Sequence, residues 1–122
     1  MNTDVHIQST DLTGALRTYI KRRLHFALGR FAGKVGRVTV HVKDVPGAGA
    51  TPDASCRIRI ELLPGGQMIR HEAVHSNLYI AIDLATEHIG RVFKRELDRI
   101  RSVDAVRNLL AETRYSPKGR SN

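Results

Sequence analysis

Residues 77–101 constrain the fold of this chain more than any other stretch, because their pattern fits one long two-faced helix. Taken as a helix, the stretch spans roughly 36 Å at ~1.5 Å per residue. Its apolar residues recur at spacings of three and four, which aligns them on one helical face; they are Leu78, Ile82, Ala85, Ile89, Phe93, Leu97 and Ile100. One face of this helix is therefore built to pack against the rest of the chain.

The opposite face of the same stretch is mostly positive. It carries His88, Arg91, Lys94 and Arg95, with Asp98 among them. The whole chain has 20 Lys and Arg against 12 Asp and Glu, a net charge of +8 and a pI near 10.4. Such an excess on 122 residues favours a polyanionic partner, most often nucleic acid. The alternative is a solvated helix face whose charge only aids solubility.

Four other segments alternate apolar and polar residues, as half-buried strands do. They are residues 4–9, 37–43, 56–62 and 67–75. The clearest places Cys56, Ile58, Ile60 and Leu62 on one face. The weakest is 67–75, whose inward face includes His71. Turn residues separate the last three segments, namely a loop rich in Pro and Gly at 45–53 and the turn Pro64-Gly65-Gly66.

A first amphipathic helix is predicted from residue 13 to about residue 30. Its apolar set is Ala15, Leu16, Tyr19, Ile20, Leu24, Ala27 and Leu28, with Leu12 and Phe31 at its ends. Arg17, Lys21 and His25 line the far side at spacings of four. Arg23 and Arg30 fall inside the apolar sector, which places them at its rim with their charged ends in water or near the fraying end of the helix.

The predicted order is β-α-β-β-β-α, an α+β fold. The first helix joins two parallel strands, and the last three strands form an antiparallel meander. Two helices packed on one face of a four-stranded mixed sheet bury every apolar face. The length suits one domain, which we place at residues 1–101.

Residues 102–122 form a C-terminal extension that we predict to be partly helical and then disordered. Val103, Val106, Leu109 and Leu110 have helix-like spacing. The segment is a continuation of the long helix, a separate short helix or a partner-binding segment. Residues 115–122 are polar and basic, which favours disorder.

The sequence contains no convincing catalytic or metal-binding pattern, so we predict no enzyme and no cofactor. Cys56 is the only cysteine, and its inward strand position predicts a small core residue. His71 and His75 lie in a predicted strand, roughly 13 Å apart at ~3.3 Å per residue, too far to share a metal ion. No signal peptide and no apolar run of membrane-spanning length is present, so a cytoplasmic protein is expected.

The remaining signal is the basic surface of the two helices. Arg predominates over Lys there, and its guanidinium fork suits phosphate, which favours RNA. Aromatic residues make up only 5% of the chain and Trp is absent, so phosphate contact is expected rather than base stacking. The candidate RNA-binding residues are Arg17, Lys21, Arg22, His88, Arg91, Lys94, Arg95 and Arg101.

Two motifs carry a family likeness. Leu78-Tyr79-Ile80-Ala81-Ile82-Asp83, followed by Ile89, Arg91, Phe93 and Arg95, resembles the second helix of the ribosome hibernation-promoting factor and ribosome-associated inhibitor family. Leu12-Thr13-Gly14-Ala15-Leu16-Arg17 is similar to the start of its first helix, with Arg23 at a downstream basic position. Arg23 therefore joins the candidate RNA-binding residues. The likeness covers roughly residues 4–100.

The resemblance implies a non-catalytic factor without cofactor or small-molecule substrate. It implies binding to the small ribosomal subunit, through its 16S-type RNA, in the channel that messenger and transfer RNA use. Translation is then silenced in stationary phase or stress. It leaves open the protein's own oligomeric state and whether ribosomes are dimerised or only inactivated.

The chain departs from the family at three places. His88 stands where a Lys is usual, Phe26 and Ala27 replace a Lys-Leu pair, and the 45–53 loop is somewhat long. The extension matches neither the acidic tail of short members nor the dimerisation domain of long ones. An alternative is therefore a diverged RNA- or protein-binding module with a non-ribosomal partner.

Overall fold

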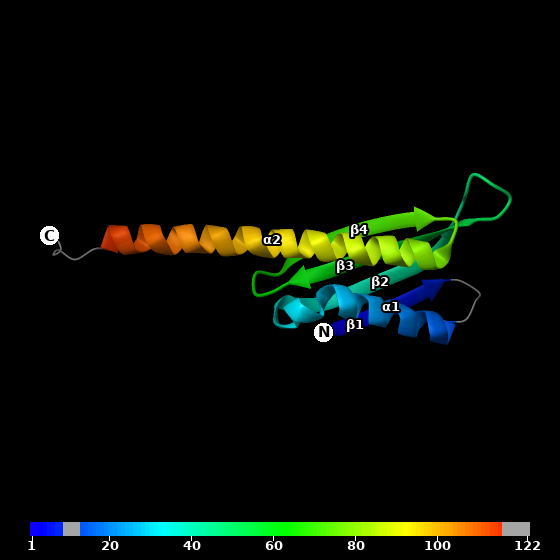
Figure 1. The fold of residues 1–122 in the computed structure, drawn as a ribbon, viewed down its shortest axis with the longest axis horizontal. Helices are drawn as coiled ribbons and strands as arrows, with labels where there is room; N and C mark the ends of the chain where they lie inside the picture. The colour runs from blue at the N-terminus through cyan, green and yellow to red at the C-terminus, as the bar shows by residue number, and fades with distance from the viewer. Residues whose placement is uncertain (9–12, 116–122) are drawn as a thin grey trace.

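The computed structural model describes residues 1–8 and 13–115 and has the predicted order of elements (Figure 1). A short 3-10 helix, η1, follows the first α-helix. The elements are β1 (Asn2–Gln8), α1 (Thr13–Leu28), η1 (Gly29–Lys34), β2 (Val35–Val45), β3 (Asp53–Leu62), β4 (Gln67–His75) and α2 (Leu78–Tyr115). The α+β prediction is confirmed.

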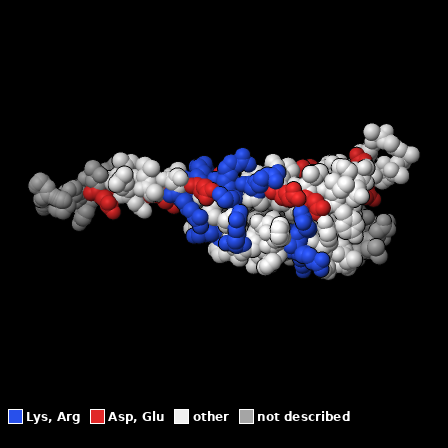
Figure 2. Space-filling model, in the orientation of Figure 1, with Lys and Arg blue, Asp and Glu red and all other residues white. Residues whose placement is uncertain are grey.

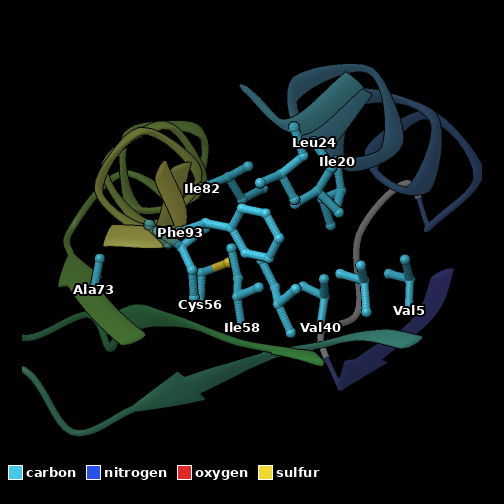
Figure 3. Packing of buried hydrophobic residues seen from close by; sticks show 14 of the residues in the cluster. Val5, Ile20, Leu24, Val40, Cys56, Ile58, Ala73, Ile82 and Phe93 are labelled. Atoms are coloured by element: carbon cyan, nitrogen blue, oxygen red, sulfur yellow. The ribbon is translucent and has the colours of Figure 1, made fainter. Parts of the chain in front are cut away.

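The four strands form one mixed sheet in the order β1-β2-β3-β4. β1 and β2 are parallel, with Val5 opposite Val40, and the β2–β3 and β3–β4 pairs are antiparallel. Both helices lie on the same face of the sheet, as predicted (Figures 1 and 3). The other face of the sheet carries no helix among the described residues, so the molecule has two distinct faces.

The core lies between the helices and the inner face of the sheet (Figure 3). Every inward strand residue of the alternating pattern in β3 is buried, from Cys56 to Leu62. Burial raises the pKa of the Cys56 thiol to about 12, which keeps it protonated as a core residue. Phe93 of α2 is fully buried, and its ring lies 5.7 Å from that of Phe31. The apolar face of α2 therefore packs as its spacing predicts.

Two details of the first helix differ from the prediction. α1 ends at Leu28 rather than at Arg30, because the chain tightens into η1 at Gly29 before entering β2. Ala15 is exposed, since it lies about 100° round the helix from Leu16. The fully buried stripe is the i,i+4 series Leu16, Ile20, Leu24 and Leu28. Leu12 lies outside the described residues.

α2 is longer than its apolar face. Its 38 residues span about 57 Å at ~1.5 Å per residue, so the helix projects past the sheet (Figure 1). Asn77 caps it, because its Oδ1 accepts hydrogen bonds from the Tyr79 and Ile80 amides at 2.9 and 3.3 Å. The last buried side chain is Leu97. The extension thus begins as a continuation of the same helix, and the disorder predicted beyond Tyr115 falls outside the described residues.

Candidate nucleic-acid interface

The face of the molecule that carries the helices is strongly basic. Figure 2 shows Lys and Arg side chains gathered over α2 and over the first helical segment, with a smaller acidic group between them. α1 and η1 contain no Asp or Glu, and besides His25 they carry six Lys and Arg residues, which are Arg17, Lys21, Arg22, Arg23, Arg30 and Lys34. α2 adds exposed arginines on its solvent side, among them Arg91 and Arg95. A polyanion approaching this face meets cations from both helices.

A groove of about 550 Å³ runs between the two helices. Its lining residues come from both sides and are Arg23, Phe26, Ala27, Arg30, Glu87, Gly90, Arg91 and Lys94. The helices approach closely at its floor, since a Cβ on Gly90 would lie 3.2 Å from the Cβ of Ala27. The absence of a side chain at Gly90 therefore leaves the groove open above the contact.

A polar network joins the two helices beside this groove. The Tyr19 hydroxyl donates a hydrogen bond of 2.6 Å to Asp83 Oδ1, which raises the pKa of Tyr19. Arg23 Nε lies 3.1 Å from Asp83 Oδ1, and Arg23 Nη2 lies 3.1 Å from Glu87 Oε2. Only Nη2 donates a well-aligned hydrogen bond, to Glu87. Two carboxylates of α2 thus hold a cation of α1. The network fixes the spacing of the helices and compensates much of the charge of Arg23.

The structure places the predicted RNA-binding residues in three settings. Arg23, Arg91 and Lys94 line the groove. Lys21, Arg22, Arg95 and Arg101 are exposed on the helices outside it. Arg17 is exposed but leans on the sheet, where its Nη1 donates a hydrogen bond of 2.6 Å to the Val5 carbonyl. Contact of these residues with RNA stays a prediction.

The sequence predicts that His88 lies on one exposed surface with Arg91 and Arg95. The structure does not place it there. It is half-buried, and its ring stacks on that of His71 with centroids 3.8 Å apart. The pKa of His71 is lowered, chiefly by burial and then by the neighbouring His88. His88 therefore covers the edge strand β4. The prediction that His71 lies on the inward face of its strand is confirmed by this packing.

Sequence reasoning missed two residues of the groove. Phe26 is 83% exposed and lies on its wall, and Arg30 lies beside it after the end of α1. Phe26 could have been identified from the sequence, because it is a large aromatic residue outside the apolar face of α1. The sequence places Arg30 with Arg23 at the rim of the apolar sector but not among the RNA-binding candidates, and in the structure it lies in η1 just beyond the end of α1.

The open face of the sheet is also basic, but its charges are more balanced. Arg57, Arg59 and Arg70 are exposed there. Arg37 on the same face forms an ion pair of 2.7 Å with Asp4. Asp4, Glu61 and Glu72 lie among the basic residues of the open sheet, whereas α1 and η1 contain no acidic residue. The helical face is the stronger candidate for a polyanion.

Two negative observations apply to residues 1–8 and 13–115. No helix in that part of the chain is long and apolar enough to cross a membrane. No group of three or more His, Cys, Asp or Glu side chains in it is arranged to hold a metal ion.

Comparison with known proteins agrees with this architecture. The model of the family described as sigma 54 modulation protein / S30EA ribosomal protein matches residues 3–101. The chain is similar to the solved N-terminal domain of Thermus thermophilus Protein Y, with 27% identity and a TM-score of 0.62 over 78% of this chain and 98% of that one.

A second solved structure is a ribosomal subunit interface protein from Coxiella burnetii. It is 16% identical, with a TM-score of 0.65 over 80% of this chain and 99% of that one. At that identity the likeness shows the fold alone. No curated protein matches the chain.

Proposed function

Because the chain belongs to the sigma 54 modulation protein / S30EA ribosomal protein family, we propose that it is a non-catalytic factor that binds the small ribosomal subunit. It occupies the channel used by messenger and transfer RNA and inhibits translation under stress or in stationary phase, in the cytoplasm. The observation that carries this proposal is the cationic face built jointly by α1, η1 and α2.

Phosphate recognition explains how such a face binds ribosomal RNA. Arg22, Arg91 and Arg95 are exposed, and a guanidinium fork donates two parallel hydrogen bonds to one phosphate. Contacts of this kind position a protein on RNA without reading base edges. Helix α2 supplies such phosphate contacts along its length. Inhibition then follows from occupying space, and no covalent step or cofactor is needed.

The residues that carry binding belong to a domain of residues 1–101, as proposed from the sequence. The family match ends at residue 101, and the core ends at Leu97 with a half-buried Ile100. Residues 102–122 then form a C-terminal extension outside this domain.

Competition on purified small subunits tests the proposed channel directly. We expect the protein to displace messenger RNA and initiator transfer RNA from the subunits, and an excess of both RNAs to displace the protein. Filter binding with labelled RNA measures the first effect, and sedimentation of the protein measures the second. Simultaneous, independent binding of the protein and both RNAs would contradict occupation of this channel.

One observation favours a second candidate function, docking of a non-ribosomal partner. Val103, Val106 and Leu110 line one side of the projecting part of α2 and are 40%, 57% and 57% exposed. Their spacing of three and four residues suits a partner helix. On this alternative the extension, rather than the cationic face, anchors the protein.

Deleting residues 102–122 separates the two candidates. We expect the shortened chain to remain bound to small subunits and to change its free energy of unfolding by less than about 1 kcal/mol, because the described side chains 102–112 are all exposed. Sedimentation and urea denaturation measure the two quantities. Loss of ribosome binding by a folded, shortened protein would identify the extension as the anchor.

A further inference from the structure

Phe26 is the most exposed large apolar side chain in the part of the chain that the structure describes. It is 83% exposed, although Ala27 and Leu28 beside it pack toward the core. A single exposed apolar residue needs no explanation by itself. The surroundings of this ring are what distinguish it.

Phe26 stands on the wall of the interhelical groove among cations. The Arg23 guanidinium lies 5.9 Å from the centre of its ring. Arg30, Arg91 and Lys94 line the same groove, and its floor is the apolar contact of Ala27 with Gly90. The groove thus combines an accessible aromatic face, an apolar floor and basic side chains.

This combination matches one unpaired nucleotide. An unstacked base offers a flat π face to an aromatic side chain, while its flanking phosphates need cations. An apolar segment of a protein partner would fit the ring but would leave Arg30 and Arg91 uncompensated, since neither forms an ion pair within the described residues, whereas Lys94 is paired with Asp98 at 3.0 Å. Glu87 does not change this balance, because Arg23 already binds it.

We propose that Phe26 stacks on an unpaired base of ribosomal RNA while Arg30, Arg91 and Lys94 bind the adjoining phosphates. This rests on the proposed function and adds a nucleotide-binding subsite to it. The scarcity of aromatic residues argues against a platform for several bases, and this site needs only one ring. Phe26, the aromatic residue of this subsite, stands where the family pattern has a Lys.

The first test compares the affinity of Phe26→Ala and Phe26→Tyr for purified small subunits. Stacking on one base is worth about a five- to hundredfold change in affinity on truncation to alanine. We expect Phe26→Ala to lose affinity by that factor and Phe26→Tyr to keep most of it. Both substitutions are at an exposed site, and circular dichroism checks that the fold is unchanged. Equal affinity of wild type and Phe26→Ala would overturn the proposal.

The second test uses the absence of tryptophan from the chain. Phe26→Trp introduces a single indole, which stacking on a base should quench. We expect quenching by a short oligoadenylate and little by an abasic strand of equal length and charge. Val74→Trp, on the open face of β4 at a 48% exposed site, is the matched control and should respond to neither. Equal quenching of the Phe26→Trp variant by both strands would contradict stacking.

The outcomes also separate this subsite from the function on which it rests. If the wild type binds subunits and Phe26→Ala binds equally well, the function stands and the subsite fails. If the wild type does not bind subunits, the function fails, and the oligonucleotide titration still decides whether Phe26 stacks on bases. If Phe26→Ala weakens subunit binding while RNA does not quench the Phe26→Trp variant, the ring contacts a ribosomal protein and the proposal is wrong.

Discussion

Replacing Arg91 and Arg95 together by glutamate is expected to release the protein from small ribosomal subunits. Both side chains are exposed on α2, and neither forms an ion pair within the described residues. A hydrogen bond to a charged group is worth about 1.5–3 kcal/mol, so losing two phosphate contacts lowers affinity about a hundredfold or more. The slope of log affinity against log salt should become shallower by about two. Sedimentation across a salt series measures both effects.

A matched control distinguishes the helical face from net charge. Arg57→Glu with Arg59→Glu changes the charge of the chain by the same amount, on the open face of the sheet. We expect this variant to keep most of its affinity for small subunits. If both double variants lose affinity equally, net charge rather than the helical face governs binding. If the α2 variant binds as the wild type does, the helix-face mechanism is wrong.

The largest effect on stability is expected from Phe93→Ala. Phe93 is among the largest fully buried side chains and lies between α2 and the sheet (Figure 3). Its ring also packs against that of Phe31. Truncating a buried Phe to Ala removes apolar contacts and leaves a cavity, which costs about 3–5 kcal/mol. That is a large fraction of the roughly 5–15 kcal/mol that stabilises a typical domain. Urea denaturation of the wild type and of Phe93→Ala measures the difference in the free energy of unfolding. The comparison requires that this free energy falls with urea concentration at the same slope in both proteins.

Val106→Ala is the control for this core substitution. Val106 is on the same helix but 57% exposed and beyond the sheet, so its truncation should change the free energy of unfolding by less than about 0.5 kcal/mol. A loss below about 1 kcal/mol in Phe93→Ala would mean that the core is not assembled around this ring.

The topology was predictable because it depends on local patterns. Alternation in the strands and spacings of three and four in the helices decide which side chains are buried, and these act within one element. The apolar face of residues 77–101 is buried as predicted, from Ile82 to Leu97, with Ile100 half-buried. The order of the elements then leaves few ways to cover the sheet.

The details of the candidate site depend on contacts between elements, which a helical wheel does not contain. Arg23 meets Asp83 and Glu87 from 60 and 64 positions along the chain. His88 packs on His71 because strand β4 lies beneath α2, which is likewise a contact between two elements. The groove with Phe26 and Arg30 lies where α1 and α2 approach closely at Gly90, whose added Cβ would lie 3.2 Å from that of Ala27. The pattern left the extra length of α2 as one of three alternatives, because its described side chains beyond residue 100 have helix-like spacing but cover no core.

Sucrose-gradient sedimentation of lysate from stationary-phase cells shows whether the protein binds ribosomes in the cell. We expect that at low salt the protein sediments with small subunits and whole ribosomes, and that added salt moves it steeply to the top of the gradient. A protein that stays at the top at low salt, away from every ribosomal fraction, would contradict the proposed function.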